Sequence, residues 1–230
     1  MRKGLTELVF ILDRSGSMSG LESDTIGGFN SMIAKQKKGE GEVLVSTVLF
    51  DDVVEVLHDR VNISKVEPMN DNQYFVRGCT ALLDAVGGAI HHIGNVQKYA
   101  REEDKPEKTL FIITTDGMEN ASKQYSYEEV KKKVEHQKES FGWEFLFLGA
   151  NIDAIEVAGR FGISPSRAVN YENDSEGTQL NYSVLSETVT KMRQAPCAAK
   201  MSMVLDEEDC LAPIREDHKK RSKKLGVLKI

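Results

Sequence analysis

A stretch of five residues, DRSGS at 13–17, places one carboxylate and two hydroxyl groups at alternate positions of the chain. In a loop, the side chains of Asp13, Ser15 and Ser17 can turn toward one point while Arg14 and Gly16 turn away, and the glycine permits a tight path. Carboxylate and hydroxyl oxygens are hard ligands that suit Mg²⁺, Ca²⁺ or Mn²⁺ rather than zinc. This spacing therefore indicates the binding of a divalent cation.

Two more oxygen-bearing residues stand where they can approach the same point from neighbouring loops. Thr80, in RGCTALLDAV, stands at the start of a helical pattern, and Asp116, in ITTDGMEN, follows an apolar run. Asp13 also follows an apolar run, LVFIL at 8–12. Ligand crevices in doubly wound sheets lie at the carboxyl ends of strands, and we expect both aspartates at such ends.

The elements that must position these residues include several strands. Continuous apolar runs of four or five residues are typical of parallel strands that helices cover on both faces. One pair of runs is separated only by Asp51 and Asp52, which predicts a tight hairpin and an antiparallel edge strand. Strands are expected at 8–12, 43–50, 53–61, 109–113, 145–148 and 168–171.

Helical patterns fill the segments between the strands. One of them carries a capping box, Ser126 with Glu129. The order of elements, βαββαβαβαβα, predicts an α/β chain with a doubly wound, mostly parallel six-stranded sheet, one antiparallel edge strand and helices on both faces, in a Rossmann-like arrangement. Apolar residues recur at helical spacing within 26–33, 82–93, 127–134, 152–157 and 185–192.

The pattern Asp-x-Ser-x-Ser at 13–17, followed by a distant Thr80 and a distant Asp116, resembles the metal-ion-dependent adhesion site of von Willebrand factor A (vWA) domains. The resemblance covers roughly residues 5–195, and FLFLGANIDAIEVAGRFGI and NYENDSEGT look like stand-alone bacterial and phage members. It implies direct coordination by Ser15 and Ser17, and direct or water-mediated coordination by Asp13, Thr80 and Asp116. It also favours Mg²⁺ as the cofactor, with Mn²⁺ or Ca²⁺ as alternatives.

The same resemblance implies a binding module that grips another protein through the metal. Only two of the five groups are charged, and an exposed Asp or Glu of the partner could complete the coordination. Cys79 could also be a redox-sensitive thiol beside the metal, and the interpretation that we favour over this one is a small buried hydrophobic residue. The residues flanking the ligands are expected to form a partner-facing rim: Met18, Arg77, Cys79, Met118 and Glu119.

Each piece of the motif also has a purely structural interpretation. Ser and Asp residues at 13–17 could cap a helix, Thr80 could be only an N-cap, and Asp116 with Gly117 could form only a turn. Their joint occurrence at strand ends favours metal binding.

No catalytic residue is predicted. Met18 occupies the place of the serine in a nucleophile elbow, and neither GxGxxG nor GxxxxGK[ST] occurs. Adjacent His91 and His92 point about 100° apart in a helix, so they do not form an i, i+4 metal pair. The rival function is a Mg²⁺-dependent hydrolase or phosphotransferase, because such sites also occur in phosphoryl chemistry. Neither a base nor a phosphate clamp is identifiable beside the motif.

Composition narrows the setting. A chain of 230 residues with 40% hydrophobic content can build a core, and a net charge of −6 argues against a general nucleic-acid binder. Three scattered cysteines indicate a reducing compartment. The first residues fit neither a signal peptide nor a membrane span, and we expect a cytoplasmic protein.

The composition of the sequence changes after residue 195, which predicts a vWA domain at 1–195 and a C-terminal extension at 196–230. The extension has an acidic DEED at 206–209 and then a basic end, with seven Lys or Arg and two acidic residues from Arg215 onward. Such an end could contact RNA, a membrane surface or the acidic body of the domain, or remain a solvated terminus.

Overall fold

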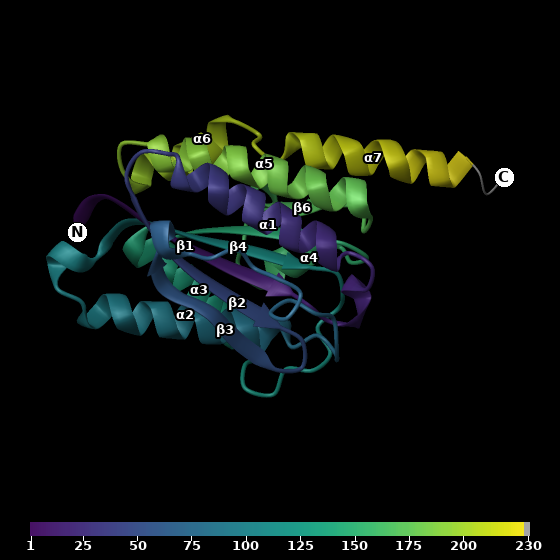
Figure 1. Cartoon of the computed structure of the whole chain (residues 1–230), viewed down its shortest axis with the longest axis horizontal. Helices are drawn as coiled ribbons and strands as arrows, with labels where there is room; N and C mark the ends of the chain where they lie inside the picture. The colour runs from purple at the N-terminus through teal and green to yellow at the C-terminus, as the bar shows by residue number, and fades with distance from the viewer. Residues whose placement is uncertain (228–230) are drawn as a thin grey trace.

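A six-stranded sheet in the order β3-β2-β1-β4-β5-β6 lies between two layers of helices in the computed structural model, which describes residues 1–227 (Figure 1). Strands β2 and β3 pair antiparallel, and all other neighbours pair parallel. The predicted fold class is confirmed. The strands are β1 (Arg2–Asp13), β2 (Glu42–Phe50), β3 (Val54–Asn62), β4 (Pro106–Thr115), β5 (Glu144–Gly149) and β6 (Ala168–Asn170).

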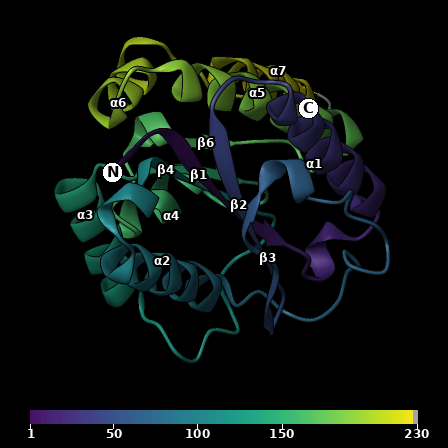
Figure 2. The same ribbon diagram turned by 60° about the vertical axis from the view of Figure 1, so that its left-hand side comes forward.

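Helices α1, α5, α6 and α7 cover one face of the sheet, and α2, α3 and α4 cover the other (Figures 1 and 2). The α-helices are α1 (Glu22–Lys37), α2 (Leu82–Tyr99), α3 (Tyr127–Phe141), α4 (Ala154–Arg160), α5 (Ser175–Gln194), α6 (Ala198–Glu207) and α7 (Ala212–Val227). The short 3-10 turns are η1 (Gly16–Met18), η2 (Ile63–Lys65), η3 (Glu102–Asp104) and η4 (Pro165–Arg167).

Strand β1 shows why its apolar run is continuous. Leu8, Phe10 and Leu12 belong to the core under α1 and α5, whereas Val9 and Ile11 belong to the core under α2 and α3. Successive side chains of a strand point to opposite faces, and both faces of this central strand are covered. The strand therefore holds Asp13 rigidly at its carboxyl end.

The predicted capping box at the start of α3 is confirmed. The Ser126 side chain accepts from the Glu129 backbone, the Glu129 carboxylate accepts from the Ser126 backbone, and Gly142 ends the helix with a φ of 64°. The hairpin differs slightly from the expected one. Strand β2 ends at Phe50 and β3 begins at Val54, because Asp51 leaves the strand direction and accepts the Val53 N–H through its carboxylate.

The C-terminal extension packs on the domain as two helices. Met201, Leu205, Leu211 and Ile214 are buried in the same apolar cluster as β1. Residues 198–207 and 212–227 are thus helical, and the interpretation as a solvated terminus does not hold for them. Of the α-helices described through residue 227, none combines the length and apolar character needed to span a membrane. The last three residues of the predicted basic end lie outside the described residues.

Candidate metal centre

Asp13 ends β1 at the carboxyl edge of the sheet, where it is 1% exposed. Its Oδ1 accepts the Ser15 N–H at 2.7 Å, and its Oδ2 accepts the Thr115 hydroxyl at 2.7 Å. The same Oδ2 accepts the backbone N–H of Asp116 at 3.2 Å. Strands β1 and β4 are parallel neighbours, so the two predicted aspartates meet at one edge.

The predicted hydroxyl groups gather beside this edge. Ser15 Oγ lies 3.1 Å from Ser17 Oγ. At Gly117, an added β-carbon would lie 3.2 Å from Thr80 Oγ1 and 3.3 Å from Ser17 Oγ, so the two hydroxyls flank one α-carbon. The structure thus brings all five predicted ligand residues into one cluster of contacts.

The loop that carries Thr80 is fixed by backbone hydrogen bonds. Gly16 N–H donates to the Gly78 carbonyl at 3.2 Å, which joins this loop to the DRSGS stretch. Thr80 N–H donates to the side-chain Oδ1 of Asn120 at 2.9 Å, and the Asn120 N–H returns to the Thr80 carbonyl at 3.1 Å. The N-cap residue of α2 is Ala81, and no side-chain hydrogen bond caps this helix. Thr80 therefore does not act as a side-chain N-cap of α2.

Arg14 turns away from the cluster, as predicted, and is fully buried. Its Nε donates to Asp51 Oδ2 at 2.8 Å and its Nη2 donates to Glu55 at 2.7 Å. Arg77 Nε donates to the same Asp51 oxygen at 2.8 Å. The buried Asp51 therefore ties the β2–β3 turn to both loops of the cluster, a role that its interpretation as a hairpin residue missed.

The environment of Asp51 keeps it ionised. Burial disfavours the charged form, but hydrogen bonds from Arg77, from the Val53 N–H and from Arg14 outweigh it and lower the pKa of Asp51. In the sequence, the only indication that Asp51 belongs near the site was its position, since it follows a strand that ends at the same edge as β1.

Asp116 is fully buried and has two asparagine partners that sequence reasoning missed. The Asn151 amide donates to Oδ1 and the Asn173 amide donates to Oδ2. Burial first, and then the charge of Asp13, raises the pKa of Asp116 to about 6, against the hydrogen bond from Asn151. Asn151 and Asn173 both fall in segments that carried the family resemblance, GANIDA and NYEND.

The predicted rim is only partly exposed. Arg77, Cys79 and Met118 are exposed, so Cys79 is not the buried hydrophobic residue of the alternative interpretation. Met18 is 5% exposed and does not face a partner, because the turn η1 points its side chain into the core. Glu119 is half-buried and accepts the N–H groups of Leu83 and Ser122, at 2.9 and 2.8 Å, so it caps local structure instead.

The donor set fits a hard divalent cation. Asp13 and Asp116 lie together without a positive partner, since the ion pairs described through residue 227 include neither. Asn173 Oδ1 is buried without a hydrogen-bond donor, which a metal-bound water could supply. Among the described residues, no group of three or more His, Cys, Asp or Glu side chains could hold a metal. The mixed carboxylate and hydroxyl cluster is the candidate.

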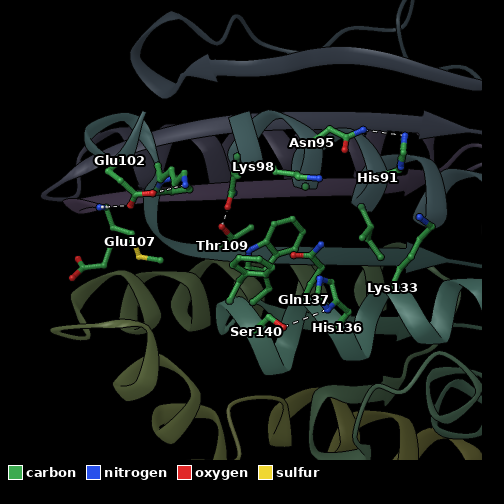
Figure 3. A pocket seen from close by; sticks show the side chains of 18 residues that line it. His91, Asn95, Lys98, Glu102, Glu107, Thr109, Lys133, His136, Gln137 and Ser140 are labelled. Atoms are coloured by element: carbon green, nitrogen blue, oxygen red, sulfur yellow. Dashed lines mark hydrogen bonds and ion pairs between the residues drawn. The ribbon is translucent and has the colours of Figure 1, made fainter. Parts of the chain in front are cut away.

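A cavity of about 550 Å³ lies at the other end of the sheet (Figure 3). Its walls come from α2, with His91, Asn95 and Lys98, and from α3, with His136 and Ser140, above the buried Trp143. It contains none of the predicted site residues, and His91 lines it while His92 pairs with Asp59.

Comparison with models of known protein families finds no match, and comparison with curated proteins finds none either. Solved structures do match. Proximal thread matrix protein 1 from the mussel byssus, described with a zinc-occupied MIDAS motif, is 15% identical with a TM-score of 0.55; the match covers 82% of this chain and 46% of that one.

The vWF domain of the type V pili tip protein Mfa5 from Porphyromonas gingivalis is 11% identical with a TM-score of 0.56; the match covers 84% of this chain and 98% of that domain. A von Willebrand factor type A protein from Catenulispora acidiphila is 12% identical with a TM-score of 0.51, over 83% of this chain and 42% of that one. This chain thus spans less than half the length of the mussel and Catenulispora chains.

Proposed function

The chain has the von Willebrand factor A fold, and from this premise we propose that it is a divalent-metal-dependent protein-binding module. One observation carries the proposal: Asp13 and Asp116 share a buried edge, with hydroxyl groups around them, and no cationic side chain among the described residues pairs with either. Two neighbouring buried carboxylates repel each other when both are ionised, unless a cation lies between or beside them.

Five side chains would hold the cation: Asp13, Ser15, Ser17, Thr80 and Asp116. Their oxygen chemistry favours Mg²⁺, with Mn²⁺ or Ca²⁺ as alternatives, and the zinc named for the mussel protein makes Zn²⁺ a necessary comparison. When bound, the cation would supply an open coordination position that attracts a carboxylate oxygen. Asp51 and Arg14 keep the loops in place, and Asn151 and Asn173 orient Asp116.

The partner we propose is a protein with an exposed Asp or Glu. Two carboxylates of the site neutralise a divalent ion, and the three hydroxyls add no charge, so an acidic side chain is the strongest remaining donor. Met118 is 73% exposed, and Phe75 is 39% exposed beside the exposed Arg77. These three side chains offer the partner apolar and cationic contacts in addition to the bond between its acidic side chain and the metal. The three unpaired cysteines suit a cytoplasmic setting.

We further propose that the site binds rather than catalyses. The side chains that hydrogen-bond to the carboxylates of Asp13 and Asp116, in the part of the chain that the structure describes, are those of Thr115, Asn151 and Asn173. None of them serves as a general base at neutral pH.

Peptide selection tests this proposal. A library of displayed peptides is selected on the immobilised protein in Mg²⁺, and bound peptides are eluted with EDTA. We expect enrichment of peptides with one essential Asp or Glu, whose replacement by Ala abolishes binding. Thr80→Ala should weaken capture, and Thr80→Ser, which keeps the hydroxyl, should retain it. Hydrolysis of p-nitrophenyl phosphate is measured in parallel.

Three results would contradict the proposal: capture that persists in EDTA, selected peptides without an essential acid, or metal-dependent phosphoester turnover that Thr80→Ala abolishes. The last of these would establish the rival enzymatic function.

A further inference from the structure

The segment between β6 and α5 contacts the candidate metal centre on one side and α7 on the other. On the inner side, the Asn173 amide donates to Asp116 and lies 3.4 Å from the Ser17 carbonyl. The residues around it, Glu172, Asp174 and Glu176, are acidic and face outward toward α7. A contact made by α7 can therefore reach a candidate metal ligand through one residue.

Helix α7 is anchored at its start by packing and by Arg215. Leu211 and Ile214 are buried, and the Arg215 guanidinium donates to the carbonyls of Ser166 and Ala168, both at 3.1 Å. Figures 1 and 2 show α7 running along the outer layer of helices beside α5. This anchor fixes where the basic side chains of the next two turns can reach.

Arg221, further along α7, makes the main contact with the acidic residues around Asn173. Its Nη1 donates to Asp174 Oδ2 at 2.6 Å, its Nε pairs with Asp217 at 2.9 Å, and its Nη2 forms an ion pair with Glu176 at 3.2 Å. Only 19% of the side chain is exposed. His218 Nδ1 lies 2.8 Å from Glu172 Oε1, so α7 contacts acids on both sides of Asn173.

The contacted segment is tightly folded, so a displacement of Asp174 would also displace Asn173. The other oxygen of Asp174 accepts the Gly177 N–H at 2.8 Å and caps α5. Gly177 approaches the Glu172 carbonyl so closely that an added β-carbon would lie 2.1 Å from it. The segment is therefore held from both ends, by the α5 cap and by Arg221.

We propose that Arg221 is a positioning residue for the metal centre, and that α7, through Arg221, holds Asn173 against Asp116. The inference rests on the proposed metal-binding function. Partners that orient a metal ligand typically change metal affinity by about 10- to 100-fold when removed. An agent that lifts α7 from the acidic segment would thus weaken metal binding without touching a ligand.

A double-mutant cycle tests this inference. Mn²⁺ and Mg²⁺ affinities are measured by titration calorimetry for wild type, Arg221→Gln, Asn173→Ala and the double variant, all in the full chain. Lys219→Gln is the matched control, because it removes the same charge from the exposed face of the same helix. Hydrogen exchange of residues 170–178 is recorded in EDTA, where no metal contributes.

We expect Arg221→Gln to weaken Mn²⁺ binding about fivefold and Asn173→Ala about tenfold, with the double variant no weaker than Asn173→Ala. Exchange at 170–178 should rise in Arg221→Gln and stay at the wild-type level in Lys219→Gln. Arg221→Lys, which keeps a charged contact with Asp174, should lie between wild type and Arg221→Gln. If Arg221→Gln does not fold, Arg221→Lys replaces it in the double-mutant cycle and is judged by the same criteria.

Three outcomes overturn the inference alone, provided that the wild type binds metal: an Arg221→Gln affinity within twofold of wild type, effects that multiply in the double variant, or an equal loss in Lys219→Gln. A wild-type protein that binds neither Mn²⁺ nor Mg²⁺ overturns the proposed function, and the coupling with it.

Discussion

At the scale of single residues, Asp116 carries the clearest electrostatic consequence of the site. Its carboxylate is buried beside that of Asp13, and its pKa rises to about 6. This pKa is above the ordinary value of 3.8. Between pH 3.8 and about pH 6, Asp116 therefore keeps a proton in the metal-free folded protein, whereas the same residue has released it in the unfolded chain. The contribution of Asp116 to stability is complete below about pH 4 and is lost as the pH rises through 6.

This shift predicts how metal affinity depends on pH. A cation needs the ionised carboxylate, so the apparent affinity for Mg²⁺ should fall about tenfold per pH unit below pH 6 and stay level above pH 7. Calorimetry at pH 5, 6 and 7.5, in buffers of different ionisation enthalpy, measures both the affinity and the released proton. An affinity that is the same at pH 5 and 7.5 would contradict the assignment of Asp116.

The five ligand residues could be predicted from sequence because their types and spacing are local and the strands before them are strongly apolar. Asn151 and Asn173 could not be identified in this way. Each makes its contact with Asp116 across 35 or more positions of the chain, and asparagine in a loop is usually a turn residue. Met18 was misjudged for a similar reason, since only the turn η1 decides that its side chain points inward.

At the scale of elements, the site depends on a buried ion pair that joins three loops. Arg14 and Asp51 are both inaccessible to solvent and lie 2.8 Å apart, and Arg77 shares the same carboxylate oxygen. The hairpin at this turn could be predicted from the sequence, but the ion pair could not. Charged residues in turns are normally solvated, and the position of Asp51 after a strand does not by itself show that its side chain is buried.

Replacing Asp51 tests this role. Asp51→Ala leaves the buried Arg14 without its main partner, and we expect a loss of about 3 kcal/mol in the free energy of unfolding. Asp52→Asn, at the exposed neighbouring position, should change it by less than about 0.5 kcal/mol. Urea denaturation in EDTA provides the measurement, and equal stability of the two variants would contradict the structural role of the ion pair.

At the scale of the whole molecule, the C-terminal extension shares the core of the domain. Its change of composition was visible in the sequence, but its packing was not, because α6 is only ten residues long and charged residues dominate the composition of α7. Its two arginines at 215 and 221 contact the body of the domain, one of the contacts that the sequence left open.

The shared core predicts that the extension contributes to stability. Ile214 is 1% exposed, and Ile214→Ala should lower the free energy of unfolding by about 2 to 4 kcal/mol. Ile155→Ala, on the surface of α4 at 42% exposure, should cost less than about 1 kcal/mol. Thermal denaturation should show one cooperative transition in both variants. A separate early transition in Ile214→Ala would show that the extension unfolds independently.

The central claim is that the hydroxyl and carboxylate cluster binds a divalent cation, and a pair of serines in the same loop tests it most directly. Ser17 belongs to the cluster, whereas Ser19 is exposed two positions later, at the end of η1. Both variants lose only a hydroxyl group. Calorimetric titration with Mn²⁺, Mg²⁺ and Zn²⁺ should give one site per chain in wild type and Ser19→Ala, with affinity at least about tenfold weaker in Ser17→Ala. Absence of saturable binding in wild type, or equal affinity in both serine variants, would contradict the account.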